Sequence, residues 1–165
     1  MLPFDYSLDF KNIDFRSSPE LYRVGKGEQG VLLVEPYKSE ILPYWRFKTP
    51  DIAKKSSEKI YDMFLDYLEK DDFVGADMAR KFIQMGYTRS RRYANHKSGR
   101  KYKTNPQKDL TKEAELKARK DILINELDPV KAESAAIFKE KWIQAKTNEK
   151  YLQLLKRHKQ MYEQE

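Results

Sequence analysis

Residues 49–70 read TPDIAKKSSEKIYDMFLDYLEK, and at this point the chain changes from loop-rich to helical. Thr49 is a good N-cap, Pro50 suits the first helical position, and the Asp51 carboxylate complements the positive end of the helix dipole. Apolar or small residues then recur four positions apart, the spacing of one helix face: Ile52, Ser56, Ile60, Phe64 and Leu68. The pattern predicts a helix from Pro50 to about Lys70.

A second helix is expected directly after the first. Asp71 or Asp72 is placed to cap it. Residues that would face inward follow at helical spacing: Val74, Met78, Phe82 and Met85. Gly86 either ends this helix or is tolerated within it at a cost of about 1 kcal/mol. The pattern leaves open whether residues 87–95 stay helical.

The C-terminal third also has helical patterns, separated from the first two helices by a loop. His96 to Asp109 hold turn formers without a periodic apolar residue, so a basic loop is expected near residues 97–109. A charged helix is then expected from Thr111 to about Leu127. Asp128-Pro129 opens another, and a last helix starts at about Asn148.

The N-terminal part has the pattern of strands and turns. Val31 to Val34 and Tyr44 to Phe47 are rich in residues that favour strands, and residues 35–40 between them resemble a loop. We therefore expect an α+β fold in one domain over residues 1–165. It would be mostly helical in residues 49–165, with a small antiparallel sheet or hairpin in residues 1–48.

Composition excludes several classes of protein. The chain has 165 residues, no cysteine and 13% aromatic residues, so it is long enough for one buried core and has neither disulfides nor thiolate metal sites. Its start lacks the basic and apolar regions of a signal peptide, and no stretch approaches the ~20 apolar residues of a membrane span. A cytoplasmic protein without a membrane partner is expected.

Positive charge is concentrated in one window. The chain carries a formal net charge of +7, and no carboxylate occurs from Met78 to Lys108. Tyr87, Tyr93 and Tyr102 are interleaved with the cations of this window. A local excess of cations beside aromatic rings is typical of polyanion binding, in which counterions are released and bases stack.

The centre of this window is the main candidate site. If the helix continues, Arg89, Arg92 and His96 share one face, and Arg91 shares the next with Asn95. So many cations would repel one another, and a phosphate-rich ligand would stabilise them through bidentate hydrogen bonds. Pairing with acidic residues of the C-terminal helices is the structural alternative. The predicted nucleic-acid or phosphate-binding residues are Arg89, Arg91, Arg92, Tyr93, His96, Lys97, Arg100, Lys101, Tyr102 and Lys103.

Gly25-Lys26-Gly27-Glu28-Gln29-Gly30 matches the pattern G-x-G-x-x-G, but weakly. A dinucleotide site needs a helix directly after the glycines, and here Val31 to Val34 resemble a strand. A hairpin turn that uses glycine for positive φ is favoured. A backbone nest for phosphate is the alternative. That second site would comprise Gly25, Lys26, Gly27, Gly30, Lys38 and Arg46.

No catalytic residues can be assigned from the sequence. His96 and His158 are the only histidines, and they lie in different expected elements. Neither a metal-ligand spacing nor a serine-hydrolase motif occurs. No metal and no cofactor are expected, and enzymatic activity stays an open question. His158, on an apolar helix face, is expected to be structural or partly exposed.

Several runs of sequence suggest a relative: ELYRVG (20–25), GEQGVL (27–32), PYKSEILP (36–43), WRF (45–47), FVGADMARKF (73–82), QMGYTR (84–89) and RYANH (92–96). Together they resemble the family catalogued as domain of unknown function 4385, over roughly residues 5 to 155. The resemblance implies a bacterial or phage protein. It brings no activity, cofactor or catalytic residue with it.

The favoured function is binding of nucleic acid or another phosphate-rich ligand through Arg89 to Lys103. One alternative is an enzyme acting on a phosphorylated small molecule, with a pocket built from residues 25–30, Lys38, Trp45, Arg46 and the start of the basic segment. Another is a protein-interaction module that uses the amphipathic C-terminal helices. The sequence distinguishes neither DNA from RNA nor one oligomeric state from another.

Overall fold

The structure is a computed structural model that describes residues 2–95 and 128–164. Its secondary structure within these ranges consists of helices alone. The five α-helices are α1 (Tyr37–Ile41), α2 (Pro50–Glu69), α3 (Phe73–Asn95), α5 (Pro129–Lys146) and α6 (Glu149–Tyr162). Three short 3-10 helices precede α2: η1 (Phe10–Asn12), η2 (Pro19–Leu21) and η3 (Leu42–Tyr44).

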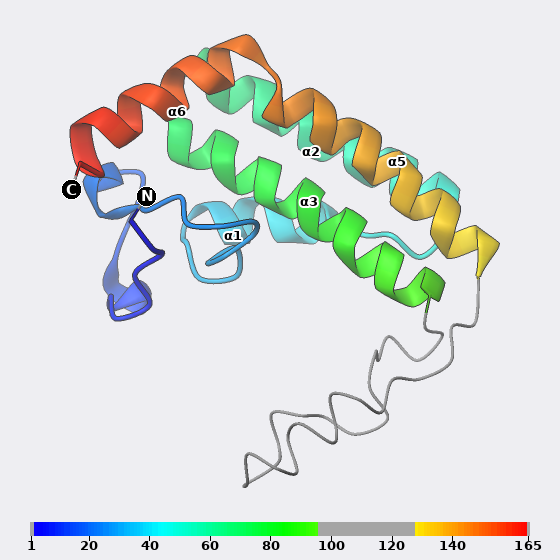
Figure 1. The fold of residues 1–165 in the computed structure, drawn as a ribbon. Coiled ribbons are helices and arrows are strands. Elements are labelled where there is room, and N and C mark those ends of the chain that lie inside the picture. The colour runs from blue at the N-terminus through cyan, green and yellow to red at the C-terminus, as the bar shows by residue number, and fades with distance from the viewer. Residues whose placement is uncertain (1, 96–127, 165) are drawn as a thin grey trace, which may run out of the picture.

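The centre of the fold is a bundle of α2, α3 and α5 (Figure 1). α3 runs antiparallel to α2 and α5, so the start of α2, the end of α3 and the start of α5 meet at one end of the bundle. At this end, the backbone N–H of Asp128 donates to the carbonyl of Ala94 at 2.8 Å. α6 packs against the beginning of α3 at the other end, beside the N-terminal segment.

Four of the predicted helix starts are confirmed. The Thr49 hydroxyl accepts the backbone N–H of Ile52, with Pro50 in the first turn of α2. The Asp72 carboxylate accepts the N–H of Gly75 in the first turn of α3. Side chains of Asp128 and Asn148 cap α5 and α6 in the same way. Local capping chemistry therefore fixes where each of these helices begins.

The question left open at Gly86 is settled, because α3 continues through it to Asn95. A Cβ atom at Gly86 would lie 2.4 Å from Cδ1 of Phe138, a ring that α5 buries completely against α3. The cost of a glycine inside the helix is thus offset by close packing of α3 on α5. α3 consequently carries Arg89 to Tyr93 on regular helical turns.

The prediction of an α+β fold with an N-terminal sheet is wrong. Residues 2–95 and 128–164 contain no strand, and the described fold is all-α. Val31 to Leu33 lie in consecutive turns, in which the Val31 N–H donates to the Glu28 carbonyl and the Leu33 N–H to the Gly30 carbonyl. Val31 and Val34 are buried, whereas Leu32 and Leu33 are exposed. Burial three residues apart fits a chain of turns and not the two-residue alternation of a strand.

The second expected strand, Tyr44 to Phe47, is also absent. η3 ends at Tyr44, and the Trp45 ring packs against Phe47 and against Phe82 of α3. The backbone is held by a helix and not by a neighbouring strand, because Ser56 Oγ of α2 donates to Tyr44 O and accepts from Arg46 N–H. Aromatic residues that favour strands thus also serve a loop that packs on helices.

The loop expected at residues 97–109 and the helix expected from Thr111 to Leu127 lie outside the described residues. None of the described helices is long and apolar enough to cross a membrane.

Candidate functional site

Three of the predicted arginines form an exposed stretch near the end of α3. Arg89, Arg91 and Arg92 are exposed, and Tyr93 beside them is half-buried. Within residues 2–95 and 128–164, none of these arginines has a carboxylate oxygen within ion-pair distance. Pairing with acidic residues of α5 or α6 therefore does not occur in the described part of the chain.

Tyr93 lies in a hollow of about 370 Å³ at the end of the bundle where α2 begins. Its walls come from the segment before α2, from α2, from the end of α3 and from the start of α5. The lining residues are Arg46, Phe47, Lys48, Ile52, Tyr93 and Lys131. Arg89 lies one helical turn before Tyr93 and so shares its side of α3. The predicted residues Arg46 and Tyr93, far apart in sequence, thus belong to one site.

A second hollow of about 370 Å³ adjoins the first and shares Arg46 and Ile52 with it. Its other lining residues are Pro43, Tyr44, Lys55, Ser56 and Lys59. The Lys59 ammonium lies 4.9 Å from the centroid of the Tyr44 ring. Among the described residues that line the two hollows, five are cationic and none is acidic. Such a surface has a positive potential, which low-dielectric walls focus.

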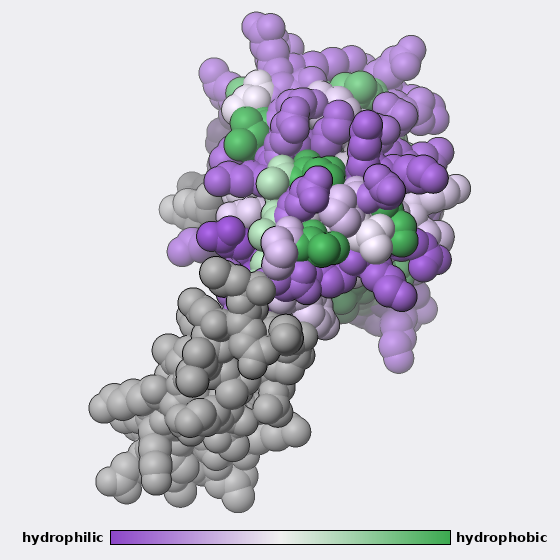
Figure 2. Space-filling model, turned by 90° about the vertical axis from the view of Figure 1, so that its right-hand side faces the viewer, coloured by the Kyte–Doolittle hydropathy of each residue, from purple (hydrophilic) through white to green (hydrophobic). Residues whose placement is uncertain are grey.

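Two contacts hold this region in place. The Lys131 ammonium donates to the carbonyl of Lys48 at 2.6 Å and joins α5 to the segment before α2. The Asp128 carboxylate accepts backbone N–H groups of Val130 and Lys131, so it serves the helix cap. We call the two hollows together with the three arginines the basic surface. Figure 2, which looks onto this end of the bundle, shows mostly hydrophilic side chains with few apolar ones between them.

The Glu28 carboxylate lies near the arginines, on the side of α3 away from Tyr93. Glu28 accepts a hydrogen bond from the Thr88 hydroxyl at 3.1 Å. Thr88 is three and four residues before Arg91 and Arg92 and therefore shares their side of α3. The end of α3 is therefore more positive on the side that carries Arg89 and faces the two hollows.

The glycine loop has positive φ at all three of its glycines: Gly25 at 68°, Gly27 at 57° and Gly30 at 78°. A Cβ at Gly30 would lie 2.0 Å from the Phe4 ring, so this position also requires glycine for space. The loop forms turns, but no strands flank them, so a hairpin is not formed.

The carbonyl groups of this loop face the cations of α3. Arg80 Nη1 donates to the Gly27 carbonyl at 2.6 Å, and Lys81 Nζ donates to the Gln29 carbonyl at 2.6 Å. A phosphate nest presents N–H groups to its ligand, whereas here carbonyl oxygens accept hydrogen bonds. The loop binds cationic side chains of its own chain, and its exposed Lys26 lines neither of the two hollows that Arg46 lines. Lys38, in α1, lines neither hollow either.

Arg80 and Lys81 belong to a buried charge cluster that was not predicted from the sequence. Its centre is Asp77, which is fully buried and accepts from Arg80 at 2.6 Å and from the Tyr151 hydroxyl at 2.6 Å. The Tyr22 hydroxyl donates to the same carboxylate. Burial alone would raise the pKa of Asp77, but Arg80, Lys81 and the two hydroxyls lower it to about 2.

Lys81 is the second cation of this cluster, and its side chain is fully buried. Burial lowers the pKa of Lys81 to about 8, despite the attraction of Asp77, whose carboxylate is 3.8 Å away. Its ammonium also lies over the rings of Phe4 and Tyr22. The cluster joins the N-terminal segment, α3 and α6, and its burial identifies it as structural.

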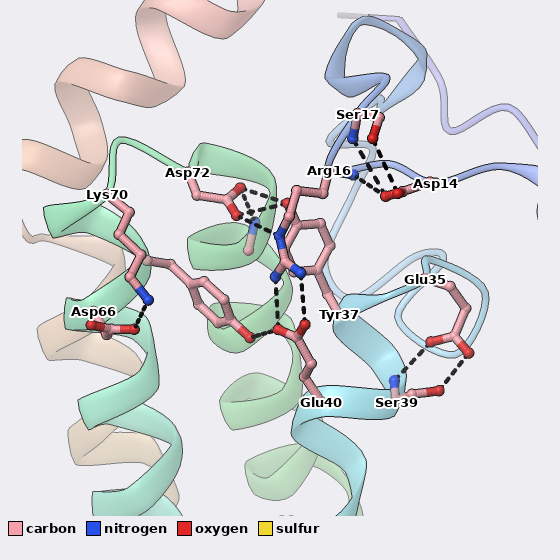
Figure 3. Close-up of polar contacts among 12 residues, drawn as sticks. Asp14, Arg16, Ser17, Glu35, Tyr37, Ser39, Glu40, Asp66, Lys70 and Asp72 are labelled. Carbon is pink, nitrogen blue, oxygen red and sulfur yellow. Dashed lines mark hydrogen bonds and ion pairs between the residues drawn. The ribbon is translucent and has the colours of Figure 1, made fainter.

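His158, expected to be structural, is buried on α6, and its Nε2 donates to the Tyr22 carbonyl at 2.7 Å. It also lines a hollow of about 430 Å³ at the α6 end of the molecule, where cations and carboxylates are mixed. Among these, Arg16 makes a bidentate pair with Glu40 at 2.8 Å and lies over the Tyr37 ring (Figure 3). Asp72, which also lines this hollow, has a carboxylate oxygen 3.7 Å from Nε of Arg16.

Four cations of the basic surface were not predicted from the sequence: Lys48, Lys55, Lys59 and Lys131. A partial signal was present, since Lys55 and Lys59 are four residues apart on a predicted helix. Lys131 joins them only because α5 packs beside α2. The remaining predicted residues, His96, Lys97, Arg100, Lys101, Tyr102 and Lys103, lie outside the described residues. Within the described residues, no group of three or more acidic or histidine side chains could hold a metal ion.

Fold and surface together describe an all-α protein with a cationic, aromatic-lined end. A comparison with models of protein families gave a match to this chain: the model of the domain of unknown function 4385 matches residues 5–161. The chain therefore belongs to this family, as the resemblance in its sequence implied. Comparisons with curated proteins and with solved structures gave no match.

Proposed function

We propose that this protein binds nucleic acid through its basic surface. The observation that carries the proposal is the lining of the two adjoining hollows, which combines five cations with three aromatic rings and no acidic residue among those described. Phosphate groups favour such cations, and nucleic-acid bases favour the rings beside them.

The extent of the surface favours a polymer over a small phosphorylated molecule. The hollows share Arg46 and Ile52, so their cations form a continuous series, and Arg89 extends it along α3. A single phosphate group occupies one or two cations, whereas a polyanion with regularly spaced charges can contact the whole series. An enzyme pocket that includes the glycine loop has less support, because the loop carbonyls face Arg80 and Lys81.

Anisotropy of a labelled oligonucleotide at several salt concentrations tests the proposal. If about five phosphates are contacted, log K against log salt should have a slope of roughly −4 to −5 on duplex DNA and correspondingly less on a single strand. Arg89→Ala, Arg91→Ala and Arg92→Ala combined should weaken binding and reduce the slope by about 2 to 3.

The matched control removes the same charge at the other end of the molecule. Lys156→Ala, Arg157→Ala and Lys159→Ala on α6 lower the net charge by the same amount, outside the basic surface. This control variant should keep most of the affinity. Equal weakening by both triple variants would mean that net charge alone drives binding, and no binding at low salt would refute the proposal.

A further inference from the structure

Two aromatic rings stand together in the hollow that Tyr93 lines. The ring centroids of Phe47 and Tyr93 are 6.1 Å apart, with an angle of 34° between the planes. Both residues are half-buried, so each ring is fixed by packing and still contributes to the wall of the hollow. Rings held in this way provide a preformed platform on which a nucleobase can stack.

Cations surround these rings on several elements. Arg46 and Lys48 flank Phe47 in the sequence, and Lys131 lies across the hollow on α5. Because Lys131 donates to the Lys48 carbonyl, the two sides are fixed relative to each other. A base on the rings would therefore have its backbone phosphates beside positive charge.

The adjoining hollow repeats this combination. Tyr44 is 46% exposed, and Lys55 and Lys59 line the hollow with it. Arg46 belongs to both hollows and lies between the two aromatic sites. Each hollow thus combines aromatic with cationic side chains, the two kinds of group that the bases and the phosphates of a single strand need.

From this arrangement we infer that the protein prefers single-stranded nucleic acid and stacks unpaired bases on Phe47, Tyr93 and Tyr44. The inference rests on the proposed function and specifies its ligand. In a duplex the faces of the bases are covered by their neighbours, so rings within a hollow cannot reach them. A duplex would be bound through its phosphates alone, whereas a single strand gains stacking as well.

The decisive experiment compares a labelled single strand of thymidines with a duplex of equal length at equal salt. Tyr93→Leu should weaken single-strand binding by roughly 10- to 100-fold, which corresponds to the loss of stacking on a base. Binding to the duplex should change by less than about two-fold, because phosphate contacts remain. Tyr93→Phe retains the ring and should retain the affinity.

Tyr87→Leu is the matched control on the same helix, since the Tyr87 ring stacks on Trp142 and lies in neither hollow. It should leave single-strand affinity unchanged. Because a leucine variant can lose stability, a second measurement uses the unaltered protein: ultraviolet cross-linking to an oligonucleotide with 5-bromouracil, followed by mass spectrometry. The cross-link should map to Tyr93, Phe47 or Tyr44.

The outcomes separate this inference from the proposed function. Equal affinity for single strand and duplex, with Tyr93→Leu affecting neither, overturns the stacking inference and leaves nucleic-acid binding in place. Cross-links confined to residues outside the two hollows overturn it as well. If neither nucleic acid binds at low salt, the proposed function itself fails. A matching ribonucleotide strand, tested in parallel, shows which sugar the same stacking site accepts.

Discussion

Arg80 and Lys81 lie in the first half of α3 and are buried, whereas Arg89, Arg91 and Arg92 lie in the second half and are exposed. The buried pair is satisfied within the chain, by Asp77 and by carbonyls of the glycine loop. The exposed arginines have no ion pair with a carboxylate among the described residues. The cations in the first half of α3 therefore stabilise the fold, whereas those in the second half lie on the surface of the protein.

The cation-rich window is therefore not a single functional unit. The carboxylate-free window begins at Met78, one residue after Asp77, and the Asp77 carboxylate lies within ion-pair distance of two buried cations of the window. Counting charge within the window thus overstates the surface charge. What distinguishes the two groups is burial, because a buried cation is costly unless a partner compensates its lost hydration.

The largest effect is expected for Asp77→Asn. Arg80 and Lys81 would stay buried without their counter-charge, and the free energy of unfolding should fall by about 3 to 5 kcal/mol. Urea unfolding followed by circular dichroism measures this loss. Asp66→Asn is the control, because Asp66 of α2 forms an exposed pair with Lys70 just after the helix, and such a pair should contribute far less than the buried cluster.

If Asp77→Asn costs no more than Asp66→Asn, the buried cluster does not stabilise the fold and the comparison between the two halves of α3 fails. A variant that does not fold at all agrees with the expectation, since the whole stability of such a chain is only about 5 to 15 kcal/mol.

A smaller effect is expected in acid. The pKa of Asp77 is about 2 in the folded chain, against an ordinary value of 3.8, so the unfolded chain takes up the proton first as the pH falls. The stability that this carboxylate contributes, on the order of 2 kcal/mol, is fully present above about pH 4 and is lost between about pH 4 and 2.

Carbon-13 NMR of the Asp77 carboxyl group checks this expectation, since its resonance should not titrate near pH 4. Tyr151→Phe removes one hydrogen bond to the carboxylate and should move the titration to higher pH. A titration of Asp77 near pH 4 in the unaltered protein would contradict the expected stabilisation of its charge.

Helix starts could be predicted from sequence because they are determined by a few adjacent residues. Thr49-Pro50 and Asp128-Pro129 each combine a cap with a proline in the first turn, and both predictions are confirmed. The prediction of an N-terminal sheet was wrong because the strand propensity of a residue does not specify a neighbouring strand with which it could pair. Val31 is buried in a turn, and Trp45 packs against Phe82 of α3. Both residue types are also common in strands, so their presence alone does not distinguish the two structures.

The candidate site was predictable in part. Exposure of Arg89, Arg91 and Arg92 follows from their position on α3, where the buried residues Ser90 and Ala94 face inward. The hollow could not be predicted, because Arg46, Tyr93 and Lys131 come together only through the packing of α2, α3 and α5. Nor could the partners of Arg80 be predicted, since Gly27 is 53 residues away in the sequence.

The smallest effect on stability is expected for the exposed half of α3. Arg89→Ala, Arg91→Ala and Arg92→Ala combined should change the free energy of unfolding by less than about 1 kcal/mol, because exposed side chains contribute little and alanine is the best helix former. Arg80→Ala is the comparison variant in the buried half of the same helix. It removes hydrogen bonds to Asp77, Gln84 and the Gly27 carbonyl, and it should destabilise the chain far more. Thermal unfolding of both variants measures the difference. Should the triple variant lose as much stability as Arg80→Ala, the exposed arginines would be structural, and the distinction between the two halves of α3 would not hold.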